Sequence, residues 1–554
     1  MTARNELHFL TLAEASALIA ARKLSPLEYT QALLARVEAL EPQIHAFITK
    51  TADLALDQAR TAEKEITQGR YRGPLHGIPF GAKDIYETAG ILTSGGSKVC
   101  IDNMPRENST AVQRLLDSGA VLLGKLNTHE FASGGPSLDL PWPPARNPWN
   151  TAHYTGGSSS GSGAAVAAGF LPAALGTDTG GSIRIPAAMC GVAGIKPTFG
   201  RVSRRGVIPN SFSFDHTGPL AWTVEDCAII LQAIAGHDPL DPASANQPVP
   251  DYRKALNGDI RGLRVGVIRH FWEEEGQTDP ELAAAMNAAI EVLKKLGARL
   301  QDVRLRKREA YHNVKMIVGK IEIAAIHEKE LRERPGDFGA DFLGSNLPGF
   351  LLSGIDYVHA QRERRSLVEE MDAVYEKFDV LLTASSAPAP RLDNLVGSGF
   401  SKKWENPNIY VPFNVTGSPA LIVCNGYTKS GLPLAMQIAG RPFDELSVFR
   451  VGHAYEQATQ WRARRPSLEP GNAAPALAEP TPETITLADL DPDMRNIIES
   501  GIARAGLKLT ETQRRLLYRI APTVIAAANR IRNDRPRGDD LASTFSCPDT
   551  KQKR

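Results

Sequence analysis

The chain has 554 residues, with 63 Lys and Arg against 62 Asp and Glu, which gives a formal net charge of +1. Hydrophobic residues make up 42% and charged residues 23%, which is ordinary for a globular enzyme with a sizeable core. This balanced charge gives no electrostatic reason to expect nucleic acid or an anionic membrane as a partner.

The five cysteines are too few and too widely separated for a disulfide framework or a CxxC metal site; they are Cys100, Cys190, Cys227, Cys424 and Cys547. The first residues carry charge where a secretory signal needs apolar side chains, and nowhere do about 18 apolar residues run together. We therefore expect a soluble, cytoplasmic protein that works without a metal or a cofactor.

Helices and then buried strands are expected in the first half of the chain. Residues 10–66 show apolar side chains at helical spacing, and Ser25 before Pro26 is typical of a helix N-cap followed by the first helical residue. From 75 to 235, short apolar runs alternate with glycines, which predicts buried strands joined to helices by tight loops.

Strands and helices continue in the second half. A strand, a helix and a strand are expected at 263–268, 280–296 and 298–303, a βαβ pattern that extends the sheet. Further strands are expected at 380–383 and 420–423.

The character of the chain changes after these strands. Five prolines between residues 466 and 482 predict a semi-rigid linker. Residues 492–505 and 510–531 then have helical spacing, and such a short pair cannot bury its apolar face alone, so we expect it to dock on the main domain or on another subunit. The chain would divide into a main domain (1–465), the linker (466–482), a helical extension (483–546) and a disordered tail (547–554).

Three glycine-rich stretches, at 77–84, 156–163 and 176–184, carry the residues that could perform chemistry. They hold Lys83, Ser158 and Ser182 at intervals of 75 and 24 residues. These residues and intervals resemble the amidase signature family. The resemblance implies an α/β fold, the amidase-signature fold, in which helices cover both faces of a mixed central β-sheet, with a small C-terminal helical appendage. That appendage weakly resembles the small helical subunits that accompany some enzymes of the family.

The resemblance also implies a role for each residue. Ser182 attacks the substrate carbonyl, Ser158 passes its proton to Lys83, and the same path returns a proton to the leaving amine. A cis peptide bond is expected between Gly157 and Ser158. The oxyanion hole is assigned to the backbone amides of Thr179, Gly180, Gly181 and Ser182, and the substrate pocket to the chain around Ala132.

Lysine can act as a base only when it is neutral. Lowering its pKa from about 10.4 to about 7 corresponds to about 4.6 kcal/mol, which burial can supply. Lys83 follows an apolar run at 78–82 that predicts a buried strand, and Asp84 points to the opposite face by strand alternation. No S-x-x-K sequence occurs, and none of the twelve histidines has the spacing of a metal site.

The stretch 156–163 has two other interpretations. It could be a Gly/Ser linker, but the apolar run 164–168 follows at once and predicts a buried helix with the serines at its N-terminal end. It could be a phosphate loop, but the Gly-Lys-Ser/Thr ending is missing. Ser160 departs from the family pattern, which has glycine there, and a positive φ would strain it by about 1 kcal/mol.

We expect an amidase, a hydrolase that cleaves a linear carboxamide or a related ester, carbamate or urea-type bond through an acyl intermediate on Ser182. Its partners would be a small-molecule amide and water, with no nucleic acid and no membrane. The C-terminal helices could form a homodimer contact. The residues leave the identity of the substrate open.

Two alternatives have different functions. One is the glutaminase subunit of a tRNA-dependent amidotransferase, which ranks lower because no arginine lies between Arg334 and Arg362 to hold the α-carboxylate of glutamine. The other is a catalytically silent binding or assembly protein, which ranks lower because Lys83, Ser158 and Ser182 are intact.

Overall fold

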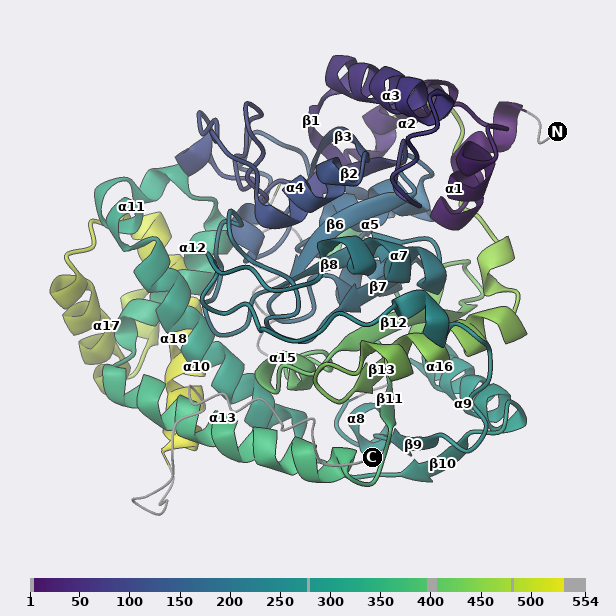
Figure 1. Cartoon of the computed structure of the whole chain (residues 1–554). Coiled ribbons are helices and arrows are strands. Elements are labelled where there is room, and N and C mark those ends of the chain that lie inside the picture. Colours follow the sequence, from purple (N-terminus) through teal and green to yellow (C-terminus); the bar gives the residue numbers. More distant parts are fainter. Residues whose placement is uncertain (1–3, 277–278, 396–405, 480–482, 533–554) are drawn as a thin grey trace.

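The centre of the protein is a single mixed β-sheet. The computed structural model describes residues 4–276, 279–395, 406–479 and 483–532, and within them eleven strands form this sheet (Figure 1). In order across the sheet, the strands are β1 (Phe47–Lys50), β3 (Val121–Leu126), β2 (Pro79–Lys83), β6 (Ala173–Asp178), β8 (His216–Ala221), β7 (Ala193–Lys196), β12 (Ala420–Tyr427), β13 (Pro433–Gly440), β11 (Val380–Ala384), β9 (Arg264–Val267) and β10 (Arg299–Asp302). The short strands β4 (Arg146–Asn147) and β5 (Asn150–Tyr154) pair separately.

Helices cover the sheet on both faces, as the α/β prediction requires (Figure 1). They are α1 (Leu12–Ala20), α2 (Pro26–Ile44), α3 (Ala52–Thr67), α4 (Thr110–Asp117), α5 (Ser160–Ala167), α6 (Arg184–Met189), α7 (Val224–Ile234), α8 (His270–Glu273), α9 (Pro280–Lys295), α10 (Arg308–Ile326), α11 (Glu328–Glu333), α12 (Ala340–Asn346), α13 (Gly354–Tyr375), α15 (Pro412–Val415), α16 (Glu445–Ala458), α17 (Pro492–Ala505) and α18 (Glu511–Ile531). In the described ranges, none of them has the length and apolar character needed to cross a membrane.

Local sequence signals set several of these elements. The side chain of Ser25 accepts hydrogen bonds from two backbone N–H groups at the start of α2, where Pro26 is the first helical residue. Strands β9 and β10 are parallel neighbours joined by α9, which confirms the predicted βαβ unit. Asp279 caps α9 in the same way as Ser25 caps α2.

The ends of two central strands place the site. Strands β2 and β6 are parallel neighbours with every residue buried, and Ala82 lies opposite Leu175. They end at Lys83 and Asp178. Carboxyl ends of neighbouring parallel strands meet at one edge of a sheet, where ligand sites of α/β proteins form. The loop after β6 therefore begins close to Lys83.

The C-terminal helices α17 and α18 dock on the main body of the same chain. They lie at one side of the molecule (Figure 1), where α18 packs against α10 and α12 and α17 packs against α18 and Leu347–Leu351. Leu517 and Ala521 of α18 share an apolar cluster with Phe342 and Leu347. Burial of this face supplies the apolar contact that the pair lacks by itself. The predicted tail at 547–554 and the last three residues of the predicted linker lie outside the described residues.

Candidate active site

Lys83 ends strand β2 and is fully buried. Its Nζ donates hydrogen bonds to Ser158 Oγ at 2.7 Å and to Thr177 Oγ1 at 2.8 Å. Burial lowers the pKa of Lys83 to about 7, although the negative charges of Asp215 and Asp178 oppose this shift. A substantial fraction of this lysine is therefore neutral near neutral pH, as a base must be.

The neighbouring Asp84 does not pair with Lys83. Its carboxylate lies 3.2 Å from Lys125 Nζ on β3 and accepts hydrogen bonds from the backbone and the hydroxyl of Ser94. This confirms that strand alternation turns Asp84 away from Lys83. A carboxylate paired with Lys83 would instead stabilise its protonated form.

Ser158 stands two residues before helix α5. The Gly157–Ser158 peptide bond is cis, as expected. Gly157 leaves room for the imidazole of His129, because a Cβ atom at this position would collide with Cε1 of that ring. Ser160 is the first residue of α5 and is not among the residues with positive φ, so the strain considered for it does not arise.

The loop after β6 carries Ser182 and is held by Asp178. The Asp178 carboxylate accepts hydrogen bonds from the Gly181 N–H at 2.8 Å and from Nε and Nη2 of Arg184 at 2.9 Å each. Burial opposes ionisation of Asp178, but the charge and hydrogen bonds of Arg184, together with Lys196 and Asn414, outweigh it and keep the pKa of Asp178 below its ordinary value. Because the Gly181 amide is engaged, the donors left for an oxyanion are those of Thr179, Gly180 and Ser182.

Asp178→Asn is expected to lower the free energy of unfolding by about 3 to 5 kcal/mol, since it leaves a buried guanidinium without its charge partner. Urea unfolding measures the loss. The control is Asp379→Asn, which alters the partly exposed pair with Arg264 and should cost about 0 to 1 kcal/mol. Equal losses in the two variants would contradict this account of the loop.

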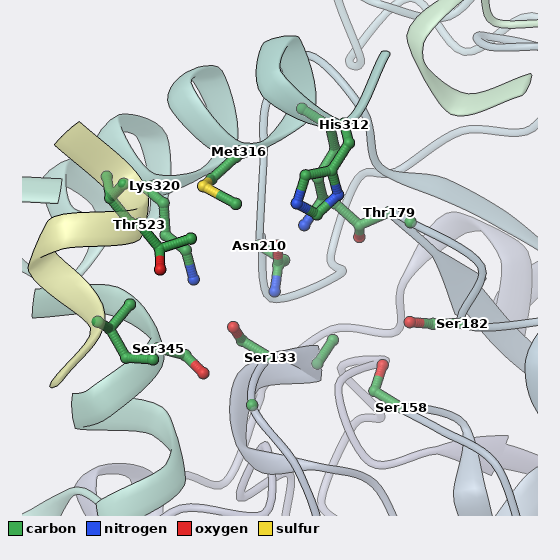
Figure 2. Close-up of a pocket in the computed structure, with 16 residues that line it drawn as sticks. Ser133, Ser158, Thr179, Ser182, Asn210, His312, Met316, Lys320, Ser345 and Thr523 are labelled. Atoms are coloured by element: carbon green, nitrogen blue, oxygen red, sulfur yellow. The ribbon is translucent and has the colours of Figure 1, made fainter. Parts of the chain in front are cut away.

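A pocket opens in front of the two serines (Figure 2). Ser158 and Ser182 lie at one end of it, and Ala132, Ser133 and Gly134 form part of its wall. In the view of Figure 2, the hydroxyl of Ser158 points toward Ser182, and the hydroxyl of Ser182 points into the pocket. In the described part of the chain no hydrogen bond joins these hydroxyls.

Several pocket residues escape the sequence reasoning. Helix α10 contributes His312, Lys315 and Lys320, and helix α18 contributes Thr523 and Val524. A sequence signal does exist for the three residues of α10. They are basic side chains at positions i, i+3 and i+8, on one side of a helix that is otherwise mostly apolar. No signal in the sequence places α18 beside the pocket. In the described ranges, no three His, Cys, Asp or Glu side chains gather as metal ligands.

A buried lysine bonded to a serine, beside a glycine-rich loop with a second serine, has the groups that nucleophilic catalysis needs. The chain belongs to the Amidase family, whose model matches residues 28–449, and it is an amidase-signature enzyme. The match ends before α17 and α18.

Related proteins cover most of the chain. A glutamyl-tRNA(Gln) amidotransferase subunit of Chloroflexus aggregans is 42% identical over 489 residues, which cover 84% of this chain and 99% of the relative. A solved structure described as a vestigial protein complex that reveals the origins of an s-triazine catabolic enzyme is 32% identical, with a TM-score of 0.75 over 83% of this chain and 100% of the other. Peptide amidase from Stenotrophomonas maltophilia is 32% identical, with a TM-score of 0.71 over 82% of this chain and 98% of the other.

The expectation of small-molecule partners without nucleic acid is wrong. The Chloroflexus relative is named as a subunit of a glutamyl-tRNA(Gln) amidotransferase. That name describes a protein that works with other subunits and on a tRNA. A balanced net charge does not exclude work in an assembly that handles nucleic acid, because another subunit can supply the basic surface. The apolar face of α18 is buried against α10 and α12 of the same chain, which is the predicted docking on the main domain, whereas a single chain does not test the predicted homodimer contact.

Proposed function

We propose that the chain hydrolyses a primary carboxamide through an ester intermediate on Ser182. Ser182 Oγ attacks the carbonyl carbon while its proton passes through Ser158 to neutral Lys83. The C–N bond then breaks, and the proton returns along the same path to the leaving ammonia. Water hydrolyses the ester and releases the acid. The observation that carries this proposal is the 2.7 Å hydrogen bond between buried Lys83 and Ser158.

The negative charge that develops on the carbonyl oxygen needs donors that are already in place. The backbone amides of Thr179, Gly180 and Ser182 are suited to this role, because all three residues line the pocket. Asp178 supports them by fixing the Gly181 amide and Arg184. Fixed donors stabilise the transition state without a cost for reorganisation during the reaction.

Within this reaction, the assignment we favour is the glutaminase subunit of a glutamyl-tRNA(Gln) amidotransferase. It is supported by 42% identity to a protein of that name over 84% of this chain. The missing arginine between Arg334 and Arg362 does not oppose it, because Lys315 and Lys320 supply cations to the pocket from another helix. The released ammonia would pass to a partner protein that amidates the glutamyl-tRNA.

Ammonia release from glutamine tests this assignment. It is measured for the chain alone and for the chain assembled with the other subunits of the amidotransferase and glutamyl-tRNA(Gln). We expect the assembled enzyme to be faster by about 5- to 150-fold, the usual range of coupling between sites. Equal rates in both states, together with rapid hydrolysis of unrelated amides, would contradict the glutaminase assignment and leave the acyl-Ser182 chemistry standing.

A further inference from the structure

The pocket continues away from the serines to a second wall made by three helices. Lys320, Ser345 and Thr523 lie on the side opposite Ser158 and Ser182 (Figure 2) and belong to α10, α12 and α18. Helix α18 lies beyond the part of the chain that matches the Amidase family. This chain therefore completes its pocket with a helix of its own extension.

Two lysines line the pocket, Lys320 on the second wall and Lys315 closer to the serines. No acidic side chain is among its described lining residues. Lys315 lies against the nucleophile loop, since a Cβ on Gly180 would lie 3.1 Å from its Cε. Lys320 Nζ makes one long hydrogen bond, 3.5 Å to Asn346 Oδ1, and has no ion pair with any described carboxylate.

His312 provides an independent indication of a ligand. Its side chain lines the same pocket, the residue is only 5% exposed, and neither ring nitrogen has a hydrogen-bond partner in the described structure. Burial and the charges of Lys315 and Lys320 lower the pKa of His312 to about 3, so the ring is neutral. A buried neutral imidazole has one N–H to donate, and leaving that donor unused is costly.

The surroundings make an anion favourable here. Burial lowers the pKa of Lys315, although Asp215 and Asp178 oppose the shift. Burial and then the charge of Lys315 lower the pKa of Lys320 to about 7. Burial therefore disfavours the protonated forms of these two amines, and a carboxylate beside them would stabilise those forms. Ile520 and Val524 of α18 add apolar surface to the same wall.

We propose that Lys315, Lys320 and His312 form a carboxylate-binding subsite, so that the substrate is an amide whose acyl part carries a carboxylate. The inference rests on the proposed function, because Ser182 must receive the acyl part of that substrate. It adds that the carboxylate is the recognised group and that an α-ammonium group is not required, since the described pocket lining has no carboxylate to receive one.

Protection of Ser182 against a fluorophosphonate probe tests the subsite. Three amides of equal chain length serve as protecting ligands: glutaramate, which carries a carboxylate; glutamine, which adds an ammonium group; and valeramide, which is neutral. We expect glutaramate and glutamine to slow labelling at about 10- to 100-fold lower concentration than valeramide. Lys320→Met should remove this advantage, and Lys320→Arg should keep most of it. Lys294→Met, on the exposed side of α9, should change nothing.

The outcomes separate the two proposals. Equal protection of the wild type by all three amides would overturn the subsite. The subsite would also be overturned if Lys320→Met weakened protection by valeramide as much as protection by glutaramate. Glutamine protecting far better than glutaramate would also overturn it, because the ammonium group would then be the recognised feature. A folded wild-type chain that the probe does not label at all would instead overturn the acyl-Ser182 reaction.

Discussion

Ser182→Ala is expected to reduce kcat/KM for a primary amide by about 10⁶-fold, the scale found when a serine nucleophile is removed from another hydrolase. Alanine removes the only atom that can form the ester, while the pocket and the loop held by Asp178 keep their contacts. Ammonia release under single-turnover conditions measures the loss. Ser430→Ala, in an exposed turn, is the matched control and should retain full activity.

Residual activity near the wild-type level in Ser182→Ala would mean that another group attacks the amide. Ser158 is the only other hydroxyl that the proposal places on the proton path. A Ser158→Ala variant that is as active as the wild type would therefore contradict the relay while leaving Ser182 as the nucleophile.

Lys83→Met is expected to lower kcat/KM by about 10²- to 10⁴-fold, the usual contribution of a positioned general base. Methionine keeps the unbranched apolar stem and removes the amine. The pH profile gives a second readout. Burial lowers the pKa of Lys83 to about 7, so the neutral base predominates above that pH. The rate at which a fluorophosphonate probe labels Ser182 in the wild type should therefore rise as the pH increases through 7. The variant should lose this rise.

Lys294→Met serves as the control, because Lys294 is solvent-exposed and pairs only with Glu291 on its own helix. A Lys83→Met variant with unchanged rate and an unchanged pH profile would show that Lys83 is structural. A wild-type rate that falls as pH increases through 7 would contradict a neutral lysine base, since protonation would then favour the reaction.

Local patterns predicted much of the fold. Helix α17 spans Pro492–Ala505, which are the limits that the sequence predicts. Asp491 is the N-cap before a proline at the first helical position, and Gly506 ends the helix in a left-handed conformation. Strand β2 was predicted because its apolar run is short and ends at Lys83. Such elements depend on residues that are close together in the chain.

The pocket depends on contacts that no local pattern contains. Asp178 is bound by Asn414, 236 residues away, at 2.8 Å. Lys320 and Thr523 line the same wall of the pocket from helices that are far apart in the sequence. The sequence therefore predicted the groups that we propose to react, whose glycine-rich surroundings are local, but not the cations and the helix that would select the substrate.

The central claim is that Ser182 forms a covalent ester, and its most direct test is the mass of the labelled site. The full chain is treated with a fluorophosphonate probe, digested and analysed by tandem mass spectrometry. We expect a single adduct on Ser182, slower formation of that adduct in Lys83→Met, and none in Ser182→Ala. An adduct on another residue of the wild-type chain, or an undiminished adduct in Ser182→Ala, would contradict the claim.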